Sequence, residues 1–484
     1  MSIGGIIACI LWAVLYLCIS YWVLHHVDDP DSRQLWLLAF LLCMPLAMIF
    51  FLLAGIDYRT PAQLQRLHGK SLETFRRDIP AHLGGQLFPE GGEARVDARF
   101  RPLARLLRNC GDGNRVFTDN SFEIITLGTR KRELLLQDIK NARRYIHIEY
   151  FRFGNDSAGK EVRDLLYQKV QEGVEVRFLN NNLIGRNIPR SYFRDMQHHG
   201  MEVLPYTHIR YGFRTWLMRI NSQNHRKIVV IDGKVAYTGG MNLNDNYFYK
   251  WRDTHLRIEG PVVARLQASF IDSWISCGGR FSHTLPYYFE PSIGLPSGPY
   301  RGKTLQIVTD APEYPWPATQ LAYQWILENA RDYVYIQTPY FIPPQPFLSA
   351  LKSAALRGVD VRVMLPRKVD TPLIGPANRS VYEECLRAGV RIFERNGQFI
   401  HSKTLVSDDG VCIIGASNLD MRSFAINNEV NTFIYDRETA LDCKQIFLSD
   451  SADVLEWTLE AWQKARPWYE DLGGRCMRLV YRVL

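Results

Sequence analysis

Two copies of one short pattern contain the residues of this chain that are best suited to phosphate chemistry. The stretch NHRKIVVIDGKVAYTGGMN begins at Asn224, and the stretch FIHSKTLVSDDGVCIIGASN begins at Phe399. Each places His-x-Lys at the start of a mostly apolar run, and residues two apart in a strand project from the same face. An imidazole and an ammonium group that project together suit a phosphate, because the lysine neutralises oxygens while the histidine attacks or protonates.

The spacing of the two stretches indicates an internal duplication. A constant offset of 176 residues relates six chemically matched pairs: His225 and His401, Lys227 and Lys403, Asp232 and Asp408, Gly239 and Gly415, Asn242 and Asn418, Asp253 and Glu429. A lone His-x-Lys on a strand is most often a surface accident. Two copies in fixed register make chance a poor explanation.

The other matched positions suggest supporting roles. Asn242 and Asn418 each follow a glycine-containing turn and could donate amide N–H groups to phosphate oxygens. A carboxylate at the matched position, Asp253 or Glu429, is suited to hold the Nδ1–H of a histidine and leave Nε2 free as the nucleophile. The sequence leaves two interpretations open for the pair Asp232/Asp408: each opens a turn and could stabilise it, or it could act in catalysis.

The elements that position these residues are strands and helices in alternation. YIHIEYF (145–151) and YVYIQTPYF (333–341) alternate with a period of two and predict strands. Helical patterns follow, and then EGVEVRFL (172–179) and RGVDVRVML (357–365) predict a further strand in each half. Strand, helix and strand in both halves predict an α/β fold. The nine cysteines are scattered without metal-ligand spacing, so we expect no metal site.

The N-terminus predicts a transmembrane hairpin, with spans at about 3–24 and 35–54. Neither run contains a charge, and each has about the 20 residues that cross a ~30 Å hydrocarbon layer. A cleaved signal peptide fits poorly, because no basic residue precedes the first run and the run is too long. Five basic residues follow the second run within 59–77, against one in the loop 25–34. The positive-inside rule then places everything beyond the hairpin in the cytoplasm.

The predicted domains are a hairpin (1–55), a juxtamembrane linker (56–114), a first α/β domain (115–290) and a second (291–484) with an amphipathic C-terminal segment. The first domain has 13 extra residues before His225. They bring Phe213, Trp216 and Leu217 together with Arg214 and Arg219. Such a mixture predicts an element at the lipid interface; an ordinary packed helix with a basic solvated face is the alternative. The net charge of +8 favours anionic membrane lipids as partners.

The motifs resemble those of a known family. HxKxxxxD followed by GGxN or GxSN, present twice, resembles the HKD motif of the phospholipase D superfamily over about residues 115–484. Three further motifs behind the two apolar runs are similar to those of bacterial cardiolipin synthases of the phospholipase D type: TPYF (338–341), LPRKVD (365–370) and NLDMRS (418–423).

The resemblance implies two tandem α-β-α sandwich domains related by a pseudo-two-fold axis, with both HKD motifs in one site. It implies that His225 forms a covalent phosphatidyl-histidine and that His401 is the acid and base. Donor and acceptor would both be phosphatidylglycerol, and the products cardiolipin and glycerol, with no cofactor or metal. Lys227, Lys403, Asn242, Asn418 and Ser417 would support the phosphate. The location would be the bacterial inner membrane.

Three alternatives stay open at this stage. One is a membrane phospholipase D that hydrolyses, and another is a transferase that uses phosphatidylethanolamine or serine as acceptor. The third is a nucleic-acid phosphodiesterase, which the apolar hairpin disfavours, so no nucleic-acid partner is expected. The sequence gives no indication of the oligomeric state. Asp420 and Arg422 in the second copy lack equivalents in the first, so the two halves are expected to differ in role.

Overall fold

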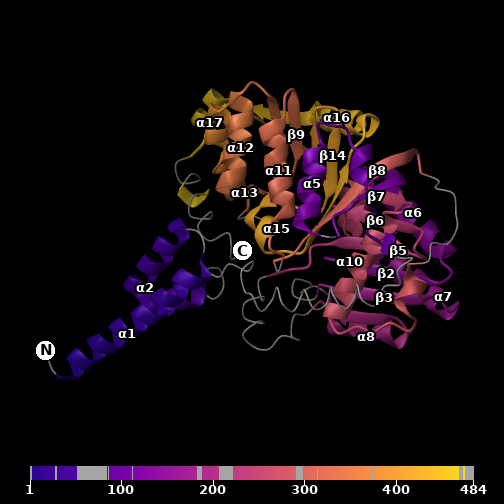
Figure 1. The fold of residues 1–484 in the computed structure, drawn as a ribbon, viewed down its shortest axis with the longest axis horizontal. Coiled ribbons are helices and arrows are strands. Elements are labelled where there is room, and N and C mark those ends of the chain that lie inside the picture. Colours follow the sequence, from indigo (N-terminus) through magenta and orange to yellow (C-terminus); the bar gives the residue numbers. More distant parts are fainter. Residues whose placement is uncertain are drawn as a thin grey trace.

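The α/β prediction is confirmed by one mixed sheet with helices on both faces (Figure 1). The computed structural model describes residues 3–27, 30–51, 84–85, 87–111, 113–181, 188–206, 222–289, 298–312, 314–371, 374–467 and 472–474. Within these ranges the main sheet has 15 strands, and β10 (Phe341–Ile342) pairs with β15 (Leu419–Asp420) in a small second sheet.

The strand order reads the same outwards in both directions from a central seam. From the seam, the first half comprises β1 (Val116–Ile125), β7 (His255–Glu259), β6 (Val235–Gly239), β5 (Lys227–Ile231), β2 (Tyr145–Tyr150), β3 (Glu175–Asn180) and β4 (Glu202–Pro205). The second half comprises β8 (Tyr300–Asp310), β16 (Glu429–Ile434), β14 (Val411–Gly415), β13 (Thr404–Ser407), β9 (Tyr333–Gln337), β11 (Asp360–Pro366) and β12 (Arg391–Arg395), with β17 (Val454–Trp457) added at the edge. Strands β1 and β8 pair antiparallel, so the duplicated halves join into one continuous sheet.

Three apolar cores lie between the sheet and its helices. One face of the first half is covered by α6 (Gly128–Asn141), α7 (Ser157–Gln171) and α8 (Arg190–His198). The corresponding face of the second half is covered by α5 (Arg101–Cys110), α11 (Ala318–Asn329), α12 (Gln345–Leu356), α14 (Tyr382–Arg387) and α17 (Leu459–Ala465). A third core, built from both halves, contains α10 (Val263–Ser276) and α16 (Arg437–Asp450).

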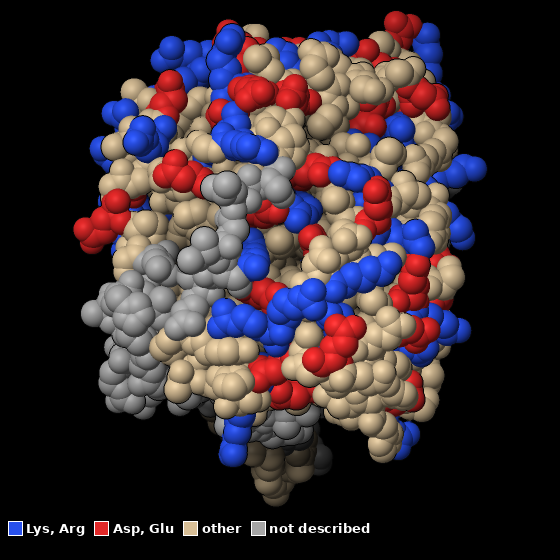
Figure 2. Space-filling view, turned by 90° about the vertical axis from the view of Figure 1, so that its right-hand side faces the viewer, with Lys and Arg blue, Asp and Glu red and all other residues tan. Residues whose placement is uncertain are grey.

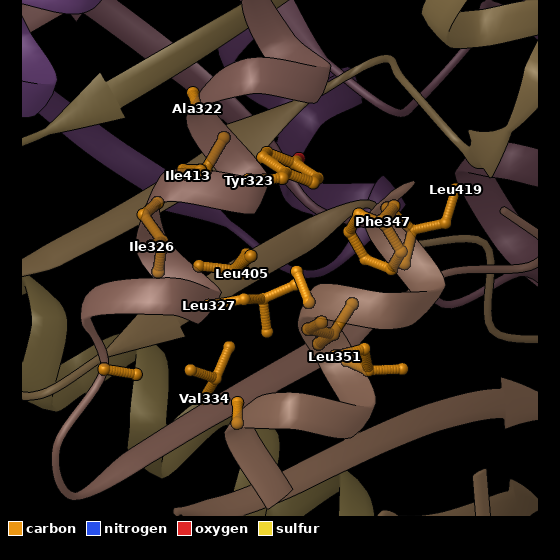
Figure 3. Packing of buried hydrophobic residues seen from close by; sticks show 14 of the residues in the cluster. Ala322, Tyr323, Ile326, Leu327, Val334, Phe347, Leu351, Leu405, Ile413 and Leu419 are labelled. Carbon is orange, nitrogen blue, oxygen red and sulfur yellow. The ribbon is translucent and has the colours of Figure 1, made fainter. Parts of the chain in front are cut away.

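Short elements complete the fold: α13 (Ile374–Arg379), α15 (Met421–Ala425), the 3-10 turns η2 (Gly92–Arg95), η5 (Leu285–Tyr288) and η6 (Ser451–Asp453), and the π-helical turn η4 (Asn246–Lys250). Figure 3 shows the core packing around β13, the strand that directly follows His401 and Lys403. Leu327 of α11 and Leu351 of α12 converge on Leu405 of β13. All three side chains are fully buried, so β13 is held firmly against the helices behind it.

Part of the segment predicted to be a linker belongs to the packed core instead. The prediction placed a linker over 56–114, but 92–95 form η2 and 101–110 form α5. Leu103 and Leu107 are fully buried and pack in the same core as α11. The reason is amphipathic spacing, because apolar residues three or four apart form one helical face. Residues 56–83 of the predicted linker lie outside the described ranges.

The predicted transmembrane hairpin is confirmed only in part. Helices α1 (Ile3–His26) and α2 (Pro30–Phe50) pack together, and the Tyr16 hydroxyl donates to the Leu37 carbonyl at 3.2 Å. Of the described helices, only the one over Ile3–His25 is long and apolar enough to cross a membrane; the apolar part of α2, Ser32–Met48, is shorter. Within this segment α2 is kinked, because Pro45 has no N–H to donate and Cys43 leaves helical geometry. The last residues of the predicted second span, 52–54, lie outside the described ranges.

Two further features bear on the sequence predictions. The extra segment with Phe213, Trp216, Leu217, Arg214 and Arg219 lies outside the described residues, as does most of the C-terminal segment. On the face turned away from the N-terminal helices, basic and acidic side chains are interspersed (Figure 2). The positive net charge therefore does not gather into one patch on that face.

Candidate active site

A cavity of about 170 Å³ lies where the two halves of the chain meet. Its lining comes from both halves: Phe151, Arg152, Gln223, His225, Tyr247, Tyr340, Asp370, Thr371, Ile374, His401, Asn418, Asp420, Arg422 and Asn427. Both motif histidines are among these residues. The duplication therefore builds one site rather than two.

Two short backbone bridges bring the histidines into this cavity. Asn224, next to His225, pairs in parallel with Asn428, and the N–H of His225 donates to the Asn428 carbonyl at 2.9 Å. In the matched contact the N–H of His401 donates to the Arg252 carbonyl at 2.7 Å. Each histidine segment is thus tied to the residue that precedes the carboxylate of the opposite half.

The carboxylates are exchanged between the halves. Nδ1 of His225 lies 3.0 Å from each carboxylate oxygen of Glu429, and Nδ1 of His401 lies 2.7 Å from Oδ2 of Asp253. The sequence predicts a carboxylate on each Nδ1, and the structure shows that the opposite half supplies it. A carboxylate on Nδ1 selects the tautomer in which Nε2 carries the free electron pair. Both rings are therefore oriented as nucleophile or base.

Burial sets the charge of these groups. Burial, followed by the charges of Lys227 and Lys403, lowers the pKa of His225 well below its usual value, so the ring is neutral near pH 7. Burial and the charge of Lys403 do the same to the pKa of His401. A neutral imidazole is the form that can attack phosphorus.

The lysines and carboxylates have pKa values shifted towards neutrality. Burial lowers the pKa of Lys227 to about 7 and that of Lys403 to about 8. Burial raises the pKa of Glu429 to about 7 and that of Asp253 to about 6. Protons are therefore exchanged easily within this site near physiological pH.

Each lysine is anchored by the histidine two residues before it. Nζ of Lys227 donates to the His225 carbonyl at 2.7 Å, and Nζ of Lys403 donates to the His401 carbonyl. Nζ of Lys403 also lies 3.1 Å from Nε2 of His401. Lys227 is the first residue of β5 and Lys403 immediately precedes β13, so each His-x-Lys pair lies at the entry to a strand rather than within it.

Among Asn242, Asn418 and Ser417, Asn418 is the residue that lines the cavity. The amide oxygen of Asn242 accepts from the backbone N–H of Arg152 at 3.1 Å, which leaves its buried nitrogen beside Tyr247. Asn418 lines the cavity directly. The hydroxyl of Ser417 accepts from Asn431 Nδ2 at 2.7 Å, and Ser417 is absent from the cavity lining.

The motif aspartates lie at the far end of the strands that follow the histidines. Asp232 and Asp408 open the β5–β6 and β13–β14 turns with positive φ, 53° and 50°, a backbone conformation that aspartate tolerates. Asp232 accepts the backbone N–H groups of residues 143, 144 and 145 at 2.7, 2.8 and 3.0 Å. Asp408 accepts those of residues 331, 332 and 333, each at 2.9 Å. These contacts fit the structural interpretation, since strands of five residues (β5) and four residues (β13), about 13–17 Å long, separate the aspartates from the histidines.

Two residues near the histidines were not predicted from the sequence. Lys131 is fully buried and donates to the Met241 carbonyl at 2.8 Å and to the Tyr150 hydroxyl at 3.1 Å, which supports the turn before Asn242. The Tyr247 hydroxyl lies 3.5 Å from Nε2 of His401. Neither residue has a matched partner that the duplication could have revealed. The described residues contain no group of three His, Cys, Asp or Glu side chains placed to hold a metal ion.

Comparisons with known proteins show which family and which solved structures this chain resembles. A family described as "Cardiolipin synthase, PLD-like domain" matches residues 135–274 and 324–451. The chain is 33% identical to the major cardiolipin synthase ClsA of Bacillus subtilis (strain 168), with 100% of both chains covered. It is 36% identical to a cardiolipin synthase of Staphylococcus aureus (strain Mu50 / ATCC 700699), covering 92% of this chain and 90% of that one. Among solved structures, the phosphatidylserine synthase of Haemophilus influenzae Rd KW20 has the same fold, with a TM-score of 0.57, 14% identity and coverage of 79% of this chain and 100% of that one.

Proposed function

Because this chain belongs to the cardiolipin synthase family of the phospholipase D type, we propose that it transfers a phosphatidyl group from one phosphatidylglycerol to another. The products are cardiolipin and glycerol. The observation that carries the proposal is the crossed pairing of His225 with Glu429 and His401 with Asp253 inside one cavity. A two-step displacement at phosphorus requires one neutral imidazole as nucleophile and a second imidazole that donates and then accepts a proton.

In the first step, Nε2 of His225 attacks the phosphorus of the donor lipid. The bond between phosphorus and the glycerol oxygen breaks, and that oxygen takes a proton from His401, so that glycerol leaves and a phosphatidyl-histidine remains. The low pKa of His401 calls for a nearby proton source, and the Lys403 ammonium, 3.1 Å from its Nε2 and with a pKa of about 8, is placed to provide one. The assignment of His225 as nucleophile follows the family resemblance.

In the second step, His401 takes the proton from a headgroup hydroxyl of the second phosphatidylglycerol. The hydroxyl oxygen then attacks phosphorus, the bond from phosphorus to Nε2 of His225 breaks, and the histidine recovers its electron pair. His401 returns the proton that it has taken to Lys403, which closes the cycle. Lys227, Lys403, Asn242 and Asn418 stabilise the charge that gathers on the phosphoryl oxygens in both transition states. We assign Asp232 and Asp408 a structural role at the far end of the strands, because they accept backbone N–H groups at the starts of β2 and β9.

The proposal includes a place at the membrane. Helix α1 is suited to anchor the chain, and α2 packs against it. Ile426, which follows α15 at the edge of the cavity, joins the apolar cluster of these two helices. We infer that α1 and α2 together hold the cavity near the lipid headgroups of the bacterial inner membrane, with the catalytic halves on the cytoplasmic side. Anionic phosphatidylglycerol would meet the site there without leaving the bilayer.

One incubation tests the reaction. Full-length protein purified in detergent is given phosphatidylglycerol alone, with a chelator present, and the products are identified by mass spectrometry. Cardiolipin and glycerol in equal amounts are expected. Phosphatidic acid and glycerol without cardiolipin would make the protein a hydrolase, and no release of glycerol would remove phosphatidylglycerol as the donor.

A further inference from the structure

The two rims of the cavity differ although the fold repeats. Phe153 bridges to Leu243, and at the matched place Phe341 pairs with Leu419. This register makes Arg152 and Tyr340, each one residue earlier, structural equivalents, and both line the cavity. One half therefore presents a guanidinium where the other presents a phenol.

The phenol belongs to a polar pair. The Tyr340 hydroxyl donates to Oδ1 of Asp370 at 2.7 Å, and Asp370 lies in the motif LPRKVD, to which the mechanism above assigns no role. The other carboxylate in the cavity, Asp420, accepts the Ser423 backbone N–H at 2.7 Å and so caps α15. Of the two carboxylates that line the cavity, Asp370 is exposed and Asp420 is buried.

The charge of Asp370 acts on His401, which associates the Tyr340–Asp370 pair with that histidine. Burial and Lys403 lower the pKa of His401, and the charge of Asp370 is the largest that acts against them. For His225, the charge of Asp420 is the largest that raises the pKa, and the charge of Arg152 lowers it further. The geometry agrees: Tyr340 follows β9, which pairs with β13 just beyond His401, and the ring centroid of Phe151, next to Arg152, lies 4.7 Å from that of His225.

We propose that Tyr340 and Asp370 form a subsite for the free hydroxyl groups of a glycerol headgroup beside His401. This inference rests on the proposed function. A carboxylate only accepts hydrogen bonds and glycerol hydroxyls donate them, whereas a phosphate in the same position would be repelled. The hydrogen bond from Tyr340 fixes Oδ1 and leaves Oδ2 to the ligand. The cavity therefore orients the headgroup, with phosphate towards Arg152 and the lysines and hydroxyls towards Asp370.

The consequence is a preference for a polyhydroxyl acceptor over water and over simple alcohols. Removing a hydrogen bond to a charged group costs about tenfold or more in relative affinity. Loss of the subsite should therefore change the choice of acceptor. Formation of the phosphatidyl-histidine on the other side of the cavity needs no contact with Asp370 when the leaving group lacks hydroxyls.

The test uses full-length protein in detergent with phosphatidylglycerol and two competing soluble acceptors, isotope-labelled glycerol and 1-propanol. The ratio of labelled phosphatidylglycerol to phosphatidylpropanol measures the choice. We expect Asp370→Asn to lower this ratio roughly tenfold and Tyr340→Phe to lower it about threefold. The exposed Asp164, which pairs with its neighbour Arg163, supplies the matched control Asp164→Asn, whose ratio should stay at the wild-type value.

Two further arms separate the outcomes. With phosphatidyl-p-nitrophenol as donor, the first-step burst should keep its wild-type rate in Asp370→Asn, which distinguishes a lost subsite from a misfolded site. With ethanolamine as the acceptor, a loss larger than that for glycerol would show an ammonium subsite and overturn the proposal. An unchanged glycerol-to-propanol ratio in both variants would also overturn it. Cardiolipin formation by the wild type from phosphatidylglycerol alone tests the proposed function separately.

Discussion

His225 and Glu429 stand in opposite halves of the chain, yet Nδ1 of the histidine lies 3.0 Å from both carboxylate oxygens. The matched pair, His401 and Asp253, repeats the relationship at 2.7 Å. Neither half can therefore orient its own histidine. Catalysis and the closure of the two halves are coupled by this exchange.

Replacing the histidines separates their roles. We expect His225→Ala and His401→Ala each to lower turnover by about 10³-fold or more, because each removes a group that makes or breaks a bond. His401→Ala should still form a phosphatidyl adduct from phosphatidyl-p-nitrophenol, which needs no acid, while His225→Ala should form none. Intact-protein mass spectrometry detects the adduct. The reverse pattern would exchange the two assignments.

Glu429→Gln should affect the first step. The amide keeps the size of the side chain but offers Nδ1 of His225 a weaker acceptor, so the required tautomer is less stabilised, and a loss of about 10²–10⁴-fold in the rate of adduct formation is expected. Asp253→Asn should instead slow breakdown of the adduct, because Asp253 serves His401. Rapid quench of a single turnover distinguishes the two. Equal effects of both variants on both steps would contradict the crossed assignment.

The activity should depend on pH in a bell shape. Burial raises the pKa of Glu429 to about 7, so below that pH the protonated group no longer accepts from His225 as a carboxylate. Burial lowers the pKa of Lys227 to about 7 and that of Lys403 to about 8, so above these values the amines no longer neutralise phosphate. The apparent limbs of kcat/KM should fall near these values. The double variant Lys227→Arg/Lys403→Arg keeps both charges and should lose the alkaline limb, even at a reduced rate; an unchanged limb would refute this origin.

Asp232 should matter for stability rather than chemistry. Asp232→Ala leaves three backbone N–H groups without their acceptor, and we expect a loss of about 1–3 kcal/mol in the free energy of unfolding. Asp408→Ala should behave alike. Thermal unfolding followed by circular dichroism measures the change, and kcat below the transition should stay within about threefold of wild type. A hundredfold loss of kcat with an unchanged Tm would restore the catalytic interpretation.

The extra segment before His225 should matter for access to lipid. Replacing Phe213, Trp216 and Leu217 by serine removes apolar area from a predicted interfacial element. Turnover of phosphatidylglycerol in vesicles should fall more than the stability of the protein does, and detergent-dispersed substrate should partly restore it. Comparing the two substrate forms with a Tm measurement checks this. Equal activity in vesicles would leave the segment without a lipid role.

Sequence by itself determined the chemistry and the repeat. The His-x-Lys spacing at the entries to β5 and β13 predicts that each histidine and its lysine share one face, and the offset of 176 residues marks two matched copies. These are local facts, since a strand aligns alternate side chains whatever surrounds it. The α/β class followed for the same reason, as did the span-length apolar helix.

Tertiary structure decided what the local pattern could not. The exchange of Glu429 and Asp253 depends on how the halves join along β1 and β8, because the paired residues are 204 and 148 positions apart. The same closure gave the cavity one rim with Arg152 and another with Tyr340. Within the first half, the pairing of β2 with β5 brings Asp232 to the backbone at the start of β2. Such contacts arise from the packing of distant segments, whose positions spacing along the chain does not encode.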